Sequence, residues 1–190
     1  MSRMPRHVRP SESTASRRDA AVPLSGERFL RPGEHYCGQD DLWVTTLLGS
    51  CVSVVLWDPL NRLGAMCHFM LARRRLHRVV AMTHSHSDGL YGQEALRWME
   101  SALAARGCPV GRCEAQVFGG ARIGSLASAA AGIGEDNVRL AVAWLDEHQV
   151  HLRRADVGGA QARRIAFHPL RGECHLSYAS PAAARREIQP

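Results

Sequence analysis

The stretch Thr45-Thr46-Leu47-Leu48-Gly49-Ser50-Cys51-Val52 joins two apolar segments through a Gly-Ser turn. Residues 42–48 contain several β-branched side chains and predict one strand, and residues 52–57 predict the next. Glycine permits backbone conformations that other residues rarely adopt, so Gly49 and Ser50 are expected to turn the chain. Cys51 then stands at the start of the second strand, where its thiol and the neighbouring backbone N–H groups can face a substrate oxygen.

His68 is the candidate base for such a thiol. A nucleophilic cysteine needs a base to take its proton and a polar group to orient that base. His68 lies in the apolar run 64–71, after a turn-forming segment at 58–64, so its strand is expected to fold back beside the Cys51 strand. The Thr45 hydroxyl can contact the imidazole there. Spacing alone favours the alternative, in which Cys51 is a small buried hydrophobe and His68 a hydrogen-bonded core histidine.

The composition is typical of one globular domain with tails. The chain has 190 residues with 45% hydrophobic content, enough for a core. No apolar run is long enough to cross a bilayer, and the basic N-terminus lacks the apolar segment of a secretory signal, so we expect a cytoplasmic protein. Its cysteines are expected to be reduced, and they include no Cys-x-x-Cys pair. They are Cys37, Cys51, Cys67, Cys108, Cys113 and Cys174.

The net charge of +6 is concentrated near the N-terminus. Residues 1–31 hold seven Arg against Glu12, Asp19 and Glu27. One interpretation is an electrostatic arm for nucleic acid or acidic surfaces. The other is a solvated tail, which we favour because the segment lacks a recognised nucleic-acid module. We therefore expect a disordered leader at 1–28, no nucleic-acid binding, and a flexible tail at 181–190.

The remaining pattern predicts an α+β domain over residues 29–180. Residues 32–41 are expected to form a polar loop. One amphipathic helix is expected at 92–106, and a second runs through Glu147 with Asp136 or Asn137 as its N-cap. Further strands are expected at 114–118 and 150–157, followed by a hairpin of 163–167 and 174–178. This mixture favours helices packed on sheet layers.

The pattern His84-x-His86-x-Asp88 is a possible metal site. Alternate spacing in a serine-rich loop fixes no coordination geometry, so the loop interpretation is favoured and no metal is expected.

Several motifs in a fixed order resemble the CheD family, the bacterial chemoreceptor glutamine deamidases. The resemblance covers about residues 30–178 and implies a layered α/β/β sandwich with a mixed sheet. The chain departs from the family pattern at Cys67, Ala72 and Leu90-Tyr91, which bears on substrate preference, and also at Ala160. The matching positions are Thr45, Leu48 to Val52, Asp58-Pro59, Gly64 to Leu71, Phe118 to Ala121, Ile133-Gly134, Asn137-Val138, Asp156 to Gly159, and Arg163.

The resemblance implies a Cys-His-Thr site in which Cys51 is the nucleophile, His68 the general base and Thr45 the third member. Backbone N–H groups near Gly49 and Ser50 would hold the oxyanion. Gly119 and Gly120 either contact substrate or only turn the chain, and turning is favoured.

The implied activity is deamidation of glutamines on the cytoplasmic helices of chemoreceptors, through a thioester and without metal or organic cofactor. The alternative function is an adaptor that binds and modulates a CheC-type phosphatase. Transamidation or proteolysis by the same cysteine is a third possibility. We expect a monomer.

Overall fold

The computed structural model describes residues 26–74, 89–122 and 132–178. Most of the expected leader, the tail from residue 181 and the His84-x-His86-x-Asp88 segment lie outside these ranges. Within them, no helix is long and apolar enough to cross a membrane.

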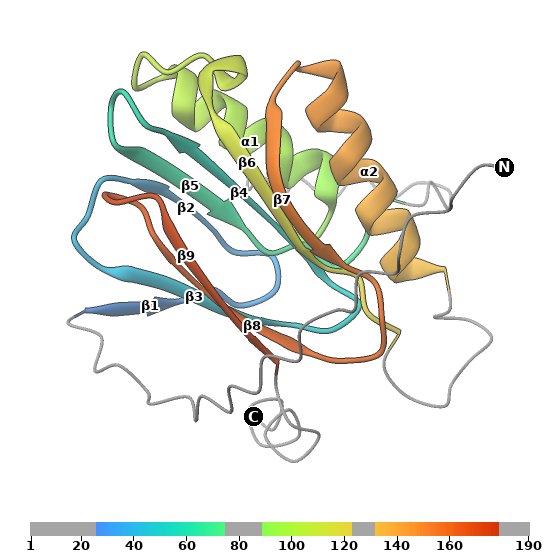
Figure 1. Cartoon of the computed structure of the whole chain (residues 1–190). Coiled ribbons are helices and arrows are strands. Elements are labelled where there is room, and N and C mark those ends of the chain that lie inside the picture. Colours follow the sequence, from blue (N-terminus) through green and yellow to red (C-terminus); the bar gives the residue numbers. More distant parts are fainter. Residues whose placement is uncertain (1–25, 75–88, 123–131, 179–190) are drawn as a thin grey trace, which may run out of the picture.

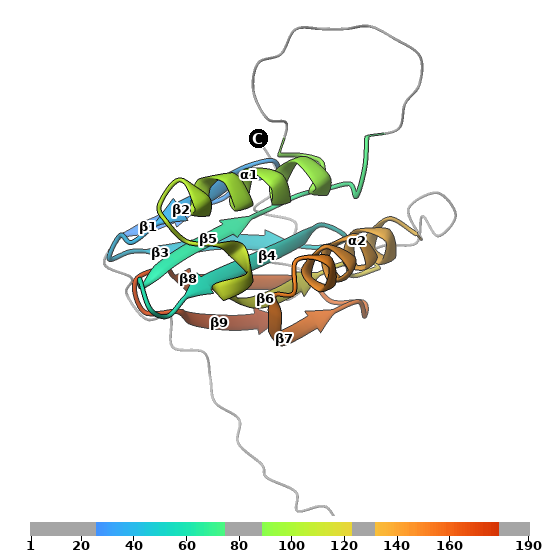
Figure 2. The ribbon, with the colours of Figure 1, turned by 90° about the horizontal axis from the view of Figure 1, so that it is seen from above.

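In the described residues nine strands form two sheets, and two helices cover one of these sheets (Figure 1). One sheet has four strands in the order β1-β3-β8-β9, and the other has five in the order β2-β5-β4-β6-β7. Viewed from above, the helices, the five-stranded sheet and the four-stranded sheet form three successive layers (Figure 2). The expected α+β sandwich with a mixed sheet is therefore confirmed.

The elements are β1 (Glu27–Phe29), β2 (His35–Gly38), β3 (Trp43–Leu48), β4 (Val52–Asp58), β5 (Leu63–Cys67), α1 (Gly92–Ala104), the 3-10 turn η1 (Val110–Arg112), β6 (Glu114–Gly119), α2 (Ile133–Glu147), β7 (His151–Val157), β8 (Arg163–His168) and β9 (Glu173–Tyr178).

Strand β4 is apolar on both faces because both of its faces are covered. Val52, Val54 and Leu56 pack toward the helices, in a core that includes Leu96 and Met99 of α1. Val55 packs in the second core, between the two sheets. A strand buried on both sides is an almost continuous apolar run, as this sequence is. The centre of the five-stranded sheet thus has a fully buried frame on which the site is built.

The turn at Gly49 and Ser50 carries the chain from one sheet to the other. Strand β3 ends in the four-stranded sheet and β4 begins in the five-stranded sheet. Strand β5 then returns antiparallel to β4, which confirms that the His68 segment folds back beside the Cys51 strand. The two strands that flank Cys51 are thus not partners in one sheet.

The N-terminal part of the fold differs from expectation. Glu27 and Arg28, assigned to a disordered leader, belong to β1, which pairs in parallel with β3. The polar segment 32–41 contains β2, which pairs antiparallel with β5. Both strands are short and lie at sheet edges, where polar residues are tolerated and the apolar alternation that predicts a strand is weak.

The second helix begins earlier than its expected caps. Helix α2 starts at Ile133 and has Gly132 as its N-cap, so Asp136 and Asn137 lie within the helix. Asn137 is fully buried. Its amide group is therefore directed into the molecule and does not cap the helix. Helix α1 lies within its expected range and buries Ala95, Leu96, Met99 and Leu103 on one face.

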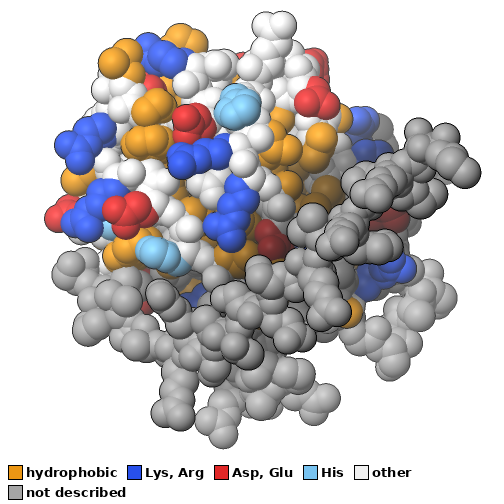
Figure 3. Space-filling view, in the orientation of Figure 1, with side chains coloured by type: hydrophobic (Ala, Val, Ile, Leu, Met, Phe, Trp, Pro, Cys, Tyr) orange, Lys and Arg blue, Asp and Glu red, His pale blue; other side chains and the backbone are white. Residues whose placement is uncertain are grey.

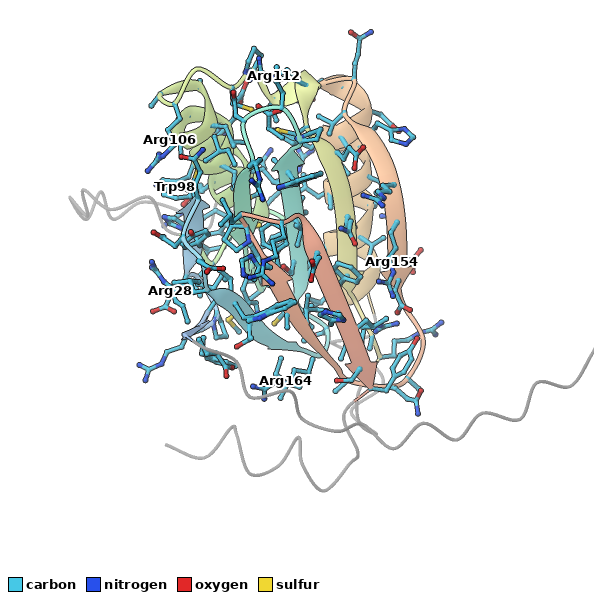
Figure 4. The ribbon with its side chains drawn as sticks, turned by 60° about the vertical axis from the view of Figure 1, so that its left-hand side comes forward. Arg28, Trp98, Arg106, Arg112, Arg154 and Arg164 are labelled. Carbon is cyan, nitrogen blue, oxygen red and sulfur yellow. The ribbon has the colours of Figure 1, made fainter. Side chains whose placement is uncertain are left out.

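Partly buried ion pairs hold the two ends of the sandwich. At one end Arg112 bonds the fully buried carboxylate of Asp58, with Nη2 2.6 Å from Oδ2. Burial is the largest single effect and would raise the pKa of Asp58, but the hydrogen bonds from Arg112, Cys108 and the Leu60 and Asn61 N–H groups together lower that pKa. Arg112 and Arg164 mark opposite ends of the molecule (Figure 4). The Asp58-Pro59 motif thus has a structural role, at the end of β4 away from Cys51.

At the Cys51 end, Arg163 of β8 joins the two sheets. Its Nε donates to Asp156 Oδ1 of β7 at 2.5 Å, and its Nη2 donates to the Gly158 carbonyl at 2.7 Å. Tyr178 of β9 donates to the other carboxylate oxygen at 2.8 Å. Arg163 is almost completely buried. Because β7 and β8 belong to different sheets, this pair is a polar link across the sandwich.

Replacing Arg163 by Met should lower the free energy of unfolding by about 2 to 4 kcal/mol, because Asp156 would remain in a partly buried position without its cation. Chemical denaturation followed by circular dichroism measures this. The double variant Asp156→Asn/Arg163→Met should recover part of the loss, since it leaves no unpaired charge. A single variant as stable as the wild type would contradict the inter-sheet role.

Candidate active site

Cys51 lies on the turn between the sheets. Three consecutive carbonyl groups of this turn each accept a hydrogen bond from another part of the chain. The Gly49 carbonyl accepts from the Ala121 N–H at 2.8 Å, and the Cys51 carbonyl accepts from the Gly120 N–H at 2.8 Å. The Ser50 carbonyl accepts from Nδ2 of Asn137 at 3.1 Å. The Cys51 side chain is half-buried and packs at the margin of the inter-sheet core. The nucleophile candidate therefore stands on a braced segment of backbone.

Gly119 and Gly120 pack closely against this turn. Both have positive φ, at 108° and 69°, which favours glycine. A Cβ on Gly119 would lie 2.1 Å from the Cys51 carbonyl oxygen, and one on Gly120 would lie 2.5 Å from the Val138 side chain. Both residues are buried. Their positions support the turning role and not the substrate-contact role.

His68 follows β5 and faces the same inter-sheet layer as Cys51. The bridge between Val52 and Phe69 continues the β4–β5 register, so Ser53 lies opposite His68 and Cys51 lies diagonal to it. Residues that lie opposite each other on antiparallel strands project from the same face of the sheet. A residue two positions along either strand projects from that face too. The His68 backbone is held by Glu34 and Gly33 of the neighbouring segment. The structure thus brings the predicted nucleophile and base to one face.

The hydroxyl at the imidazole is that of Thr46 and not that of Thr45. Thr46 Oγ1 is 2.8 Å from His68 Nδ1. Thr45 Oγ1 instead donates to Glu27 at 2.6 Å. Side chains alternate along a strand, and Thr46 shares the inner face of β3 with Val44 and Leu48. The structure therefore corrects the expectation of Thr45 as the residue that contacts the imidazole, because alternation places Thr45 on the opposite face of β3.

The hydrogen bonds around His68 define its tautomer. Thr46 has one hydroxyl proton, which it donates to the Leu30 carbonyl at 2.8 Å. We assign the ring proton of His68 to Nδ1, because Nδ1 lies 2.8 Å from Thr46 Oγ1 and 3.4 Å from the Leu30 carbonyl oxygen, which can only accept. Nε2 of His68 is then the unprotonated nitrogen. It is buried and has no hydrogen-bond partner within the described ranges. A lone pair is thus available to receive a proton.

Burial favours the neutral forms of both groups. Desolvation lowers the pKa of His68 to about 4, against smaller raising effects of the Leu30 carbonyl and Glu34. Desolvation raises the pKa of the Cys51 thiol above its ordinary value of 9.0, and the backbone N–H of Cys51 opposes this shift. The resting pair at neutral pH is therefore thiol and imidazole, not thiolate and imidazolium.

Two backbone donors remain free at the turn. Among the residues that the structure describes, neither the Ser50 N–H nor the Cys51 N–H donates to another residue, whereas the Val52 N–H donates to the Phe69 carbonyl. The Cys51 N–H belongs to the same residue as the candidate nucleophile, so this donor lies close to the thiol. Such free N–H groups beside a nucleophile can bind a developing oxyanion.

The surroundings are mixed in character. Met70, Leu71 and Leu90 are large exposed apolar side chains near this end of the five-stranded sheet. On the face shown in Figure 3, basic side chains are scattered among acidic and apolar ones. In the described ranges no three His, Cys, Asp or Glu side chains are grouped to hold a metal ion.

Alkylation of Cys51 should be slow at neutral pH and should increase with pH up to and beyond pH 9, because the thiol pKa is raised and no ion pair maintains a thiolate. Iodoacetamide labelling at a series of pH values, quantified on the Cys51 peptide by mass spectrometry, measures this profile. Cys51→Ala identifies the signal. A rate plateau between pH 5 and 8 would contradict the neutral pair.

The family model described as CheD chemotactic sensory transduction matches residues 70–178, more than half of the chain. The chain is 36% identical to a Dechloromonas aromatica protein named probable chemoreceptor glutamine deamidase CheD 3, over 86% of this chain and 92% of that protein. It is 35% identical to the corresponding CheD 2 of Albidiferax ferrireducens, over 76% of this chain and 83% of that protein. A CheD 1 protein of Anaeromyxobacter dehalogenans is 32% identical, over 83% and 93%. The chain therefore belongs to the CheD family.

Proposed function

We propose that this protein is a protein-glutamine deamidase, which hydrolyses a glutamine side-chain amide to glutamate and ammonia. The observation that carries the proposal is the contact of His68 Nδ1 with Thr46, which leaves the buried Nε2 without a partner in the described ranges. Nδ1 of His68 donates to Thr46, so that the unpartnered Nε2 can act as a base on the face that Cys51 shares. Family membership and the names of the relatives supply the substrate class.

The first half of the reaction forms a thioester. Nε2 of His68 takes the Cys51 proton while the sulfur attacks the amide carbon of the substrate glutamine. The negative charge that develops on the amide oxygen is met by the N–H groups of Ser50 and Cys51. The protonated imidazole then gives its proton to the leaving nitrogen, which departs as ammonia.

The second half releases glutamate. His68 takes a proton from water, the resulting hydroxide attacks the thioester carbon, and the thiol leaves with the proton from His68. Each step moves protons and forms or breaks one bond, without oxidation or reduction. Thr46 keeps the proton on Nδ1 throughout and stabilises the imidazolium as it forms, the role of the third member in other triads.

The resting pKa values explain why the thiol needs its substrate. A neutral thiol beside a neutral imidazole is a weak nucleophile, which limits oxidation and adventitious alkylation of Cys51. Proton transfer becomes favourable when attack on the amide carbon moves the charge onto the oxyanion. The buried site thus couples thiol activation to acyl transfer.

The proposed substrates are glutamines on the cytoplasmic helices of chemoreceptors, and the proposed compartment is the cytoplasm. Loss of the amide places a carboxylate on a helix surface, where it alters the pairing with neighbouring charges and can subsequently be methylated. The exposed Met70, Leu71 and Leu90 provide apolar area for a partner beside the turn.

Incubation with a purified chemoreceptor cytoplasmic fragment should increase the fragment mass by about one dalton per modified glutamine, since an amide becomes an acid. Peptide mass spectrometry locates the sites. Cys51→Ala and His68→Ala should each abolish the shift. Absence of a shift with several receptors, together with tight binding of a CheC-type phosphatase by wild type and Cys51→Ala alike, would favour the adaptor function instead.

The adjacent threonines offer a matched test of the orienting group. Thr46→Val should lower kcat about 10- to 100-fold, because the Nδ1 proton loses its best acceptor and the tautomer is no longer fixed. Thr45→Val, the same change one residue earlier, should lower it less than about threefold, because Thr45 contacts Glu27 on the outer face. Steady-state ammonia release measures both, and the reverse order would restore Thr45 as the third member.

A further inference from the structure

We infer that Asn137 is a positioning residue, which holds the Ser50–Cys51 peptide plane so that the Cys51 N–H is directed at the oxyanion of the reaction. The inference rests on the proposed acyl-transfer chemistry at Cys51 and extends it to helix α2. The sequence pattern predicts Asn137 only as a helix cap and as part of a family motif.

Asn137 reaches both halves of the site through one amide group. Its Nδ2 donates to the Ser50 carbonyl at 3.1 Å and to the Met70 carbonyl at 2.7 Å. Both acceptors are carbonyl oxygens, so the atom that faces them must be the NH2 group. Its Oδ1 is buried and has no partner within the described ranges. The side chain is fully buried and belongs to a regular helix, so its position is well defined.

The geometry of the peptide bond links this contact to the oxyanion. The Ser50 carbonyl and the Cys51 N–H belong to one planar, trans peptide unit and point in opposite directions. A donor that holds the carbonyl on the α2 side therefore directs the N–H away from α2. Fixing the carbonyl fixes the direction of the proposed oxyanion donor.

Asn137 differs from the other supports of the turn. The carbonyls of Gly49 and Cys51 are held by backbone N–H groups of Ala121 and Gly120, which no side-chain substitution there removes directly. The central carbonyl of the three is held by a side chain. The second contact, to Met70, holds the segment that follows His68, and the strand register places Met70 opposite Cys51. One amide thus keeps the nucleophile turn and the base segment together.

A positioning role for the oxyanion donor can be separated from a role in thiol reactivity. Alkylation by iodoacetamide is a displacement at saturated carbon and forms no oxyanion, so it reports only on the thiol. Acylation of Cys51 by p-nitrophenyl acetate passes through a tetrahedral oxyanion and depends on the backbone donors. The ratio of acylation rate to alkylation rate therefore reports on the donors.

The experiment compares the full-length wild type with Asn137→Asp and Asn137→Ala. Asp has nearly the shape of Asn but cannot donate to the two carbonyls when ionised. Glu135→Gln is the matched control, since Glu135 lies on the same turn of α2, is exposed and contacts only Arg139. Both rates are measured on the Cys51 peptide by mass spectrometry at pH 7.5, with Cys51→Ala as blank. Thermal unfolding and kcat for glutamine deamidation are measured in parallel.

For both Asn137 variants the ratio of acylation to alkylation should fall about 10- to 100-fold, with alkylation within about threefold of wild type and kcat reduced more than KM is raised. Glu135→Gln should match the wild type. An unchanged ratio in Asn137→Asp, or equal losses of acylation and alkylation in a destabilised protein, would overturn the inference. A reduced ratio with a wild type that deamidates no receptor would support the positioning role and refute the proposed function.

Discussion

The hydrogen bond between Thr46 and His68 joins the two sheets, and the candidate site depends on it. Thr46 lies on β3 of one sheet, and His68 follows β5 of the other. The Leu30 carbonyl, in the segment after β1, contacts both the Thr46 hydroxyl and Nδ1 of His68. The imidazole is therefore positioned only when the sheets are packed. Stability of the sandwich, including the Arg163–Asp156 link at this end, is thus a condition for the site geometry.

The sequence predicted that the His68 segment folds back beside the Cys51 strand, because that inference needs only local rules. A turn-forming segment between two apolar runs places the strands antiparallel, and β4 and β5 do pair in this way. Thr45 was wrong for the imidazole contact because the flanking strands β3 and β4 lie in different sheets. Which face of β3 meets His68 depends on how the sheets stack, and this is not encoded in the turn.

The role of α2 was hidden for a related reason. Asp and Asn near the start of an apolar helical pattern are the ordinary signal of an N-cap, and Asn137 fits that signal. The helix starts four residues earlier, at Ile133, so Asn137 falls on the buried face with Ala141 and Leu145. A polar residue at a buried helical position requires partners, and its partners are carbonyls far away in the sequence. No local pattern specifies such contacts.

Desolvation then gives the site its chemical character. The same burial that makes the Thr46 contact strong also lowers the pKa of His68 and raises that of Cys51, so a preformed ion pair is disfavoured. A site with a neutral resting pair relies on stabilising charge as it develops during attack. The backbone N–H donors at the turn are the groups suited to that purpose. They lie on the segment whose carbonyl groups are held by Asn137, Gly120 and Ala121. The bracing of three consecutive carbonyls and the depressed basicity of His68 are therefore two parts of one arrangement.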